Sequence, residues 1–399
     1  MKRLVVCFDG TWNSADSGGS ETSVSRIARA VRATSQQEGT QQATLYLRGV
    51  GSTGIALQRA LGGITGEGVD DNIRSAYMFL AQNYVPEVRD DAGEVIYAGD
   101  RIFVFGFSRG AFTARSLCGF IGCAGLLKRQ CLGQLADAWR YYRRGGPRTS
   151  RDFCTEFDSD CHHDLRIDFL GVWDTVGALG VPVGLLGDLT APDYKFHDTE
   201  PSSVVRRACH ALAIDEYRDE FVPTLWTGEV PEGCTVRQVW FAGAHSDVGG
   251  GYAESRLADI PLVWMAKQAE EATLVLDWSV LPDPQKLDPL APQHDSRQGW
   301  SWKDRLTPTY RRVCERDCDV GLLSRLYVPR GEDGEVLKTV NESVHPEVFV
   351  RHGSEVDTIR RTAENSKDPE KERAVYDPVN LPPDAPRFAP GDGGKAGRP

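Results

Sequence analysis

Ser108 lies in the sequence Gly106-Phe-Ser-Arg-Gly110, which has the pattern of a nucleophile elbow. In such an elbow the serine sits on a sharp turn between a strand and a helix, and two glycines leave room for the strained backbone that exposes its hydroxyl. An apolar, strand-forming run over residues 101–105 precedes the pattern, and a helix-favouring stretch follows it. This context favours Ser108 as a nucleophile over the structural alternative, a serine that only caps the helix.

A serine nucleophile needs a base and an acid that orients the base, and two later strand ends supply candidates. An apolar run over residues 165–173 ends at Asp174, and another over residues 234–241 leads into a glycine-flanked segment that contains His245. The chain order Ser, Asp, His is that of an α/β-hydrolase triad. We therefore expect His245 to be the general base and Asp174 its orienting acid, with capping of the following turn as the alternative role of Asp174. Asp247 is a rival acid, but it is better suited to holding its own glycine loop.

The first strand, residues 3–8, runs directly into Asp9-Gly10-Thr11. Open α/β sheets bind ligands at the carboxyl ends of their strands, so this loop is expected to face the same site as the elbow. Backbone N–H groups of Gly10 or Thr11, together with that of Arg109, the residue after the nucleophile, are candidates for an oxyanion hole. Asp9 either braces its own loop or binds a metal ion or phosphate, and we favour bracing.

Two other functions remain open on these residues. The first is a metal-dependent phosphoester hydrolase in which Ser108 is a bystander and a cation is held by carboxylates and an imidazole, namely Asp9, Asp174, His245 and Asp247. The second is a binding module without catalytic activity. The serine hydrolase interpretation requires no cofactor, and the glycine-rich residues 49–54 lack the lysine and the spacing of a nucleotide-binding loop.

Strand-like runs alternate with helical stretches, which predicts an α/β fold. We expect an α/β-hydrolase-like three-layer sandwich with a mostly parallel central sheet and helical or loop insertions. We expect one such domain over residues 1–365, with an insertion around 128–164 and a C-terminal elaboration from about residue 272. Residues 366–399 are rich in charged residues, proline and glycine, and predict a poorly structured or docked tail. The expected helices cover residues 24–32, 69–84, 202–213 and 260–271.

The composition excludes one class of partner and limits another. With 57 acidic and 46 basic residues the net charge is −11, whereas nucleic-acid binding needs a basic surface. Neither a secretory signal pattern nor an apolar stretch of membrane-spanning length is present, so we expect synthesis as a cytoplasmic protein. Residues 179–189 are apolar but broken by glycine and proline, and either line an acyl pocket, make a peripheral contact with a lipid surface, or pack as a core loop.

Ten cysteines are scattered at irregular spacing, and several lie inside apolar stretches. This usage predicts buried free thiols of a reducing compartment rather than a disulfide framework. Cys154 and the segment Cys161-His162-His163 form the one local cluster. Their spacing is unlike the paired ligands of a structural zinc site, so no metal is expected there.

With these residues in view, the chain resembles the family catalogued as domain of unknown function 2235, also described as the catalytic domain of type VI secretion phospholipase effectors of the first lipase class. The matching segments, within roughly residues 1–270, are Cys7-Phe-Asp-Gly-Thr-Trp-Asn13, Gly106-Phe-Ser-Arg-Gly-Ala111, Gly171-Val-Trp-Asp-Thr-Val176 and Ala242-Gly-Ala-His-Ser-Asp-Val-Gly-Gly-Gly-Tyr252. A weaker match at Ser343-Val-His345-Pro346 makes His345 a reserve base. The resemblance implies a triad of Ser108, Asp174 and His245, esterase or phospholipase activity, and signal-independent secretion as an effector.

Overall fold

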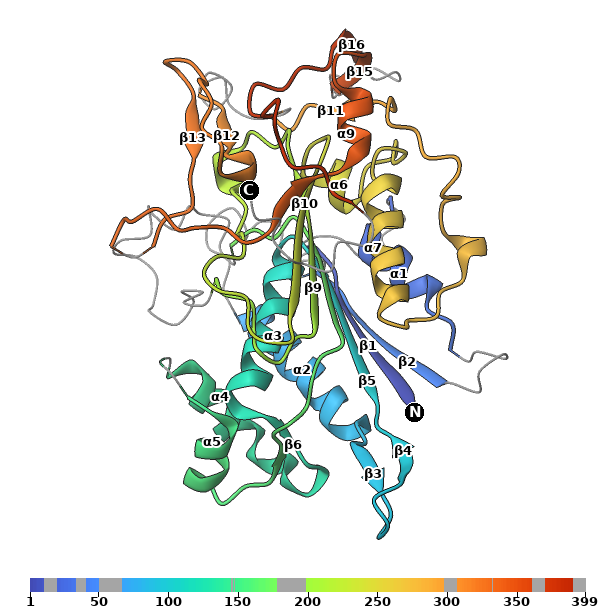
Figure 1. Ribbon diagram of the computed structural model, residues 1–399, viewed down its shortest axis with the longest axis vertical. Helices are drawn as coiled ribbons and strands as arrows, with labels where there is room; N and C mark the ends of the chain where they lie inside the picture. The colour runs from blue at the N-terminus through green and yellow to red at the C-terminus, as the bar shows by residue number, and fades with distance from the viewer. Residues whose placement is uncertain are drawn as a thin grey trace.

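A parallel sheet of seven strands lies at the centre of the molecule (Figure 1). The computed structural model describes residues 1–10, 20–33, 41–49, 67–144, 146, 148–177, 199–297, 307–331, 333–360 and 370–389. In the order of their pairing, the strands are β14 (Glu342–Val344), β10 (Thr235–Phe241), β9 (Arg207–Ala213), β8 (Phe169–Trp173), β5 (Arg101–Phe107), β1 (Lys2–Phe8) and β2 (Gln41–Leu47). All neighbouring pairs in this sheet are parallel. The carboxyl ends of the strands therefore share one edge.

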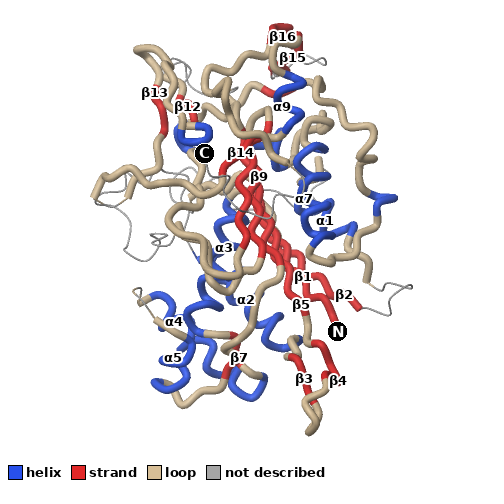
Figure 2. The backbone as a smooth tube through the Cα atoms, viewed as in Figure 1, coloured by secondary structure: helices blue, strands red, loops and turns tan. Residues whose placement is uncertain are grey.

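Helices cover both faces of the sheet and give the fold three layers (Figure 2). The helices α2 (Glu67–Asn83) and α3 (Arg109–Ala124) pack on one face, and α1 (Ser23–Ala30) and α7 (Asp259–Glu271) pack on the other. Side chains of β1 alternate between the two cores, with Leu4 and Val6 facing α2 and α3, and Val5 and Cys7 facing α1 and α7. Strands buried on both faces are nearly continuous apolar runs, which is why the sequence revealed them. The predicted α/β fold with a mostly parallel central sheet is confirmed.

The strand order creates a switch point at the carboxyl edge of the sheet. From β1 the chain passes to β2 on one side and then returns to β5 on the other side of β1. Adjacent connections that leave a sheet in opposite directions open a crevice between the strands, and ligands of open α/β folds bind there. Asp9 directly follows β1 and Ser108 directly follows β5, so both lie at this position.

Two small additions lie near the opposite edge of the sheet. A hairpin of β3 (Glu87–Arg89) and β4 (Val95–Ala98) connects α2 to β5. The region expected as an insertion contains η1 (Arg129–Gln134), α4 (Leu135–Arg143) and α5 (Ser150–Glu156), next to the short pair β6 (Leu126–Leu127) and β7 (Cys161–His162). Figure 1 places α4 and α5 beside the C-terminal half of α3, away from the carboxyl edge of the sheet.

The part of the chain after α7 packs back onto the sheet. Its elements are η4 (Trp278–Val280), β11 (Gln293–His294), β12 (Thr309–Arg311), η5 (Val313–Glu315), β13 (Arg325–Tyr327), β14, α9 (Pro346–Arg351), β15 (Glu355–Arg360) and β16 (Glu370–Val375). A third core joins Leu212 of β9 and Trp240 of β10 to Val344 of β14 and to Tyr376. None of the helices in the described residues is long and apolar enough to cross a bilayer.

The helix expected over residues 202–213 is wrong, because this stretch contains strand β9. Its sequence, Arg-Ala-Cys-His-Ala-Leu-Ala, favours a helix by intrinsic propensity. However, β9 is hydrogen-bonded on both sides, to β8 and to β10, and every residue of it except Arg207 is buried. Burial between two strands and two layers of helices overrides local propensity here.

Candidate active site

Ser108 occupies a strained turn between β5 and α3. Its backbone has φ 59° and ψ −123°, a left-handed conformation that is rare for residues other than glycine. The flanking glycines are required by close contacts: a Cβ on Gly106 would lie 2.4 Å from the carbonyl oxygen of Gly110, and a Cβ on Gly110 would lie 2.3 Å from that of Phe8. The sequence pattern thus folds into the sharp strand-turn-helix geometry expected of it.

The hydroxyl of Ser108 does not cap α3, although the residue occupies the N-cap position. The helix-cap role, the structural alternative for this serine, is therefore not what the structure shows. No hydrogen bond joins the hydroxyl to His245, and such contacts are often long in the absence of substrate. The imidazole of His245 nevertheless lies against the elbow strand, because its ring centroid is 4.6 Å from that of Phe107.

Asp174 and His245 form a buried pair. Nδ1 of His245 lies 2.6 Å from Oδ2 of Asp174, and the two residues are 4% and 0% exposed. Asp174 follows β8 with φ 38°, and its Oδ1 accepts the backbone N–H of Ala213 at 3.0 Å. His245 begins the short helix α6 (His245–Gly249) after β10, rather than lying in an open loop. Two residues that the sequence assigned to one relay are thus brought together from separate strand ends.

Arg311 of β12 also binds Asp174, a contact that no sequence pattern indicates. Its Nη1 lies 2.6 Å from Oδ1 and its Nη2 lies 2.9 Å from Oδ2 of the carboxylate. Burial alone would raise the pKa of Asp174, but Arg311 and the hydrogen bond from His245 hold it well below its usual range. Asp174 is therefore ionised at neutral pH.

A second ion pair lies next to the backbone of His245. Glu216 is 1% exposed, accepts the backbone N–H of His245 at 3.2 Å, and binds Arg218 through both carboxylate oxygens at 2.8 and 2.6 Å. Burial opposes ionisation of Glu216, yet Arg218 lowers its pKa. Burial lowers the pKa of His245, and the hydrogen bond to Asp174 offsets only part of this effect. The imidazole is consequently neutral at pH 7, the state required of a general base.

The oxyanion-hole candidates occupy different environments. Arg109 is the first residue of α3, where backbone N–H groups and the helix dipole favour negative charge. Burial lowers the pKa of its guanidinium to about 10. The N–H of Gly10 is directed at its neighbour, since it donates to Oδ1 of Asp9 at 2.7 Å. Thr11 lies outside the described residues.

Asp9 braces the loop that follows β1. Besides the N–H of Gly10, its carboxylate accepts hydrogen bonds from the hydroxyls of Thr22 and Tyr46. Burial raises the pKa of Asp9, and these three donors act in the opposite direction. The geometry is that of the bracing role preferred from the sequence, which leaves the carboxylate little capacity for an additional ligand.

Asp247 binds a different histidine. Its Oδ1 lies 2.6 Å from Nδ1 of His294, and its Oδ2 accepts the backbone N–H groups of Ala244 and His294 at 3.0 and 2.9 Å. Asp247 thereby fixes the start of α6 and does not orient His245. His294, like Arg311, belongs to the C-terminal part of the chain and was not singled out from the sequence.

The four residues of the metal hypothesis do not assemble into a ligand set. Within the parts of the chain that the structure describes, Asp9, Asp174, His245 and Asp247 are not close enough together to hold one cation. Each carboxylate is instead bound to its own partners, as described above. This arrangement gives the metal-dependent phosphoester hydrolase no geometric support.

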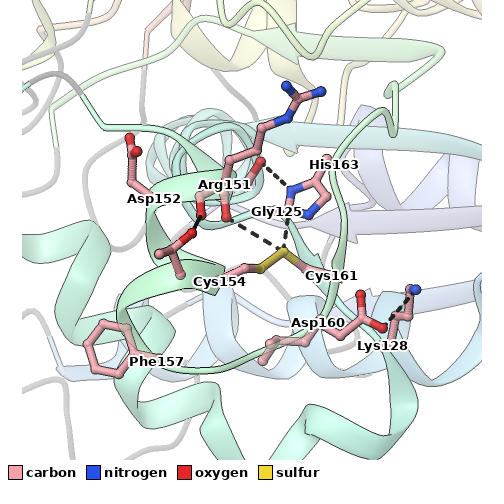
Figure 3. Close-up of a disulfide and its surroundings, with 12 residues drawn as sticks. Gly125, Lys128, Arg151, Asp152, Cys154, Phe157, Asp160, Cys161 and His163 are labelled. Atoms are coloured by element: carbon pink, nitrogen blue, oxygen red, sulfur yellow. Dashed lines mark hydrogen bonds and ion pairs between the residues drawn. A yellow bond between two sulfur atoms is a disulfide. The ribbon is translucent and has the colours of Figure 1, made fainter.

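The one group of potential metal ligands in the described residues is Cys154, Cys161 and His163 (Figure 3). The two sulfur atoms form a disulfide, and Sγ of Cys161 lies 3.7 Å from Nδ1 of His163. The expectation of free thiols is therefore wrong for this pair, which α5 and β7 bring together. It holds for the other eight cysteines, of which Cys7, Cys118 and Cys209 are buried.

His345, the reserve base, has a structural environment. Its ring stacks on Phe241 at 4.8 Å between centroids, and its Nδ1 accepts the N–H of Glu347 at the start of α9. Burial lowers its pKa to about 4. No described carboxylate is hydrogen-bonded to its ring, so it lacks the orienting acid that His245 has.

Several known proteins are similar to this chain in sequence or structure. An uncharacterized protein of Saccharomyces cerevisiae is 28% identical over 250 residues, which cover 57% of this chain and 33% of that protein. A crystal structure of an uncharacterized Pseudomonas aeruginosa protein is similar at 19% identity and a TM-score of 0.41, over 71% of this chain and 48% of that one. The Tle1 effector bound to the VgrG spike of the type 6 secretion system is similar at 19% identity and a TM-score of 0.34, over 64% of this chain and 52% of that one.

This chain therefore spans a third of the yeast relative and about half of each of these solved structures. The family model of the Tle1-like catalytic domain of type VI secretion phospholipase effectors matches residues 2–268, which include β1, the elbow, Asp174 and His245. The chain belongs to this family.

Proposed function

We propose that this protein is a serine hydrolase that cleaves carboxylic esters of phospholipids, with Ser108 as nucleophile, His245 as general base and Asp174 as the orienting acid. The observation that carries the proposal is the buried His245–Asp174 pair at 2.6 Å. The strained backbone of Ser108 and a hydroxyl that does not cap α3 support the choice of nucleophile. Membership of the phospholipase effector family supports the substrate class.

In the proposed reaction, Nε2 of His245 takes the proton of Ser108 as Oγ attacks the ester carbonyl carbon. The resulting tetrahedral intermediate collapses, the bond to the alcohol oxygen breaks, and the alcohol leaves with the proton from Nε2. Water then attacks the acyl-enzyme with His245 again as base, which releases the fatty acid and restores Ser108. Asp174 holds the Nδ1–H tautomer and stabilises the transient imidazolium.

The oxyanion of both intermediates is proposed to bind the backbone N–H of Arg109, at the N-terminus of α3, and one donor from the loop after β1. Because the N–H of Gly10 is directed at Asp9, Thr11 is the more suitable second donor. Removal of a single oxyanion donor typically lowers the rate by about a hundredfold or more.

We also propose a peripheral contact with the lipid surface. Residues 179–189, the segment singled out from the sequence, lie outside the described residues. At the turn before β13, however, Leu322 is fully exposed and the adjacent Leu323 is 69% exposed. Two neighbouring exposed leucines on a turn are suited to insertion between lipid head groups. Secretion as an effector, which the family suggests, would bring such a surface to a target membrane.

Sedimentation with phosphatidylcholine vesicles tests the lipid contact. A double variant, Leu322→Asp with Leu323→Asp, is expected to lose vesicle binding. Ile96→Asp is the matched control, because Ile96 is 68% exposed on β4, at the other end of the molecule (Figure 1). Equal binding by all three proteins would contradict the assignment to these leucines.

A fluorophosphonate probe tests the proposed chemistry, because it bonds covalently to an activated serine. We expect labelling at Ser108, detected by mass spectrometry of the peptide, and loss of labelling in both Ser108→Ala and His245→Gln. Ser279→Ala, which removes an exposed hydroxyl that bonds Asp277, is the matched control and should label normally. A native chain that hydrolyses lipid but is not labelled, or that loses activity with a chelator, would reject the serine mechanism.

A further inference from the structure

The guanidinium of Arg311 makes four hydrogen bonds, of which two go to the carboxylate of Asp174. Beyond its two bonds to that carboxylate, Nη1 donates to the backbone oxygen of Ala213 at 2.7 Å and Nη2 donates to that of Phe221 at 2.6 Å. The side chain of Arg311 is 1% exposed and that of Asp174 is fully buried. A planar fork on both carboxylate oxygens leaves the carboxylate one orientation, which is the one that meets Nδ1 of His245.

Arg311 is itself fixed independently of Asp174. Its backbone oxygen accepts the side-chain amide of Asn380 at 3.0 Å, and the neighbouring Thr309 donates its N–H to Tyr217 and its hydroxyl to Asp219, each at 3.0 Å. Strand β12 lies beyond residue 268, where the family match ends. The C-terminal part of the chain therefore contributes directly to the candidate active site.

The charges next to His245 are balanced in two ion pairs. Asp174, bound to Arg311, contacts the ring of His245, and Glu216, bound to Arg218, accepts its backbone N–H, so each carboxylate next to His245 has its own counter-charge. The ring contacts Asp174 after β8 and the rings of Phe107 and Phe221. The other charged groups nearby are Glu216 at the backbone N–H, its partner Arg218, and, on the same helix, Asp247 bound to His294. Burial is the remaining influence, and it favours the neutral ring.

We propose that Arg311 is a positioning residue for the hydrolase reaction: its two bonds fix the Asp174 carboxylate toward His245, and its guanidinium supplies the counter-charge of that carboxylate. The inference rests on the proposed function. It gives the C-terminal part of the chain a role in catalysis. Arg311 would act through Asp174 and would not contact the reacting atoms.

The two effects of Arg311 can be separated by substitution. In Arg311→Gln the carboxylate keeps its negative charge without a counter-charge, so the His245–Asp174 pair takes up its proton at higher pH. In Arg311→Lys the counter-charge remains but the bidentate fork is lost, so the carboxylate is less well oriented. Arg311→Gln is therefore expected to shift the acidic limb in the pH profile of the Ser108 reaction rate. Arg311→Lys is expected to lower the maximal rate, the plateau of that profile, without shifting the acidic limb.

The experiment measures the second-order rate of fluorophosphonate labelling of the full chain from about pH 4.5 to about pH 9. We expect the midpoint of the acidic limb to rise by roughly one pH unit in Arg311→Gln. In Arg311→Lys we expect the midpoint to stay near that of the native chain and the plateau to fall roughly tenfold. Arg325→Gln is the matched control, because Arg325 lies on the paired strand β13, is exposed, and binds Asp219. It should reproduce the native profile.

Thermal unfolding first establishes that each variant is folded. A folded Arg311→Gln with the native midpoint and plateau would overturn the inference while leaving the triad intact. If Arg311→Gln does not fold, Arg311→Lys decides, and a native plateau in that variant would overturn the inference. A native chain that is not labelled at Ser108 would reject the proposed function and this inference with it.

Discussion

Nδ1 of His245 lies 2.6 Å from Oδ2 of Asp174, although 71 residues separate them in the sequence. The contact depends on the parallel sheet, because β8 and β10 each end at the same edge on either side of β9. Asp174 is also bound to Arg311, so the same carboxylate serves the base and a buried cation. Substitution of this one residue is therefore expected to affect catalysis and stability by separate routes.

Asp174→Asn should lower the labelling rate of Ser108 by roughly ten-thousandfold, as loss of the orienting acid does in serine hydrolases. It should also lower the free energy of unfolding by about 3–5 kcal/mol, because Arg311 is left as a buried charge without its partner. The double variant Asp174→Asn with Arg311→Leu removes that charge, and is expected to regain part of the stability but none of the labelling. Urea unfolding and labelling together check this, and near-native labelling in Asp174→Asn would exclude it as the acid.

The pH profile of kcat/KM reports the protonation of the free enzyme's base. Burial lowers the pKa of His245 from the usual value for histidine, so the acidic limb of the native chain should have its midpoint below about pH 6.5. Glu216→Gln removes a nearby negative charge but leaves Arg218, which disfavours the imidazolium, so the midpoint should move further down. This downward shift of the midpoint is opposite in direction to the upward shift expected for Arg311→Gln. An upward shift in Glu216→Gln would contradict the proposed charge balance.

The sequence predicted those features that depend on local pattern. The elbow at Ser108 and the strand ends before Asp174 and His245 could be located because buried parallel strands are continuous apolar runs and sharp turns need glycine. Arg311 could not be identified, because a charged residue in a three-residue strand gives no local sign of a partner 137 residues away. Strand β9 was misassigned because its alanine-rich composition favours a helix, whereas its burial between two strands decides its structure.

The glycines of the elbow offer a test of its geometry that does not depend on chemistry. Gly110→Ala would place a methyl group 2.3 Å from the backbone oxygen of Phe8 and 2.5 Å from that of Asp9, and neither is the end of a flexible side chain. We expect a loss of at least about 1–3 kcal/mol in the free energy of unfolding, together with reduced labelling of Ser108. Gly133→Ala is the matched control, since no atom lies within 4 Å of the position that its Cβ would take. A Gly110→Ala protein as stable as the control would contradict the tight packing of the elbow on β1.

The C-terminal part is expected to be required for the candidate active site to form, even though the family match ends at residue 268. A chain that ends at Glu271, after α7, loses one partner of each of three buried carboxylates: Arg311 for Asp174, His294 for Asp247, and Tyr376 for Asp215. The loss of a partner of a buried charged group costs on the order of 1–3 kcal/mol, and three such losses approach the whole stability of a typical domain.

This shortened chain should therefore be readily cleaved by protease, lack the near-ultraviolet circular dichroism of a packed core, and show no fluorophosphonate labelling. A chain that ends at residue 389 keeps all three contacts and is the matched control, which should behave as the full chain does. If the chain that ends at Glu271 is protease-resistant and labelled at Ser108, the family-matched segment assembles its own site, and neither Arg311 nor the rest of the C-terminal part is needed to position Asp174.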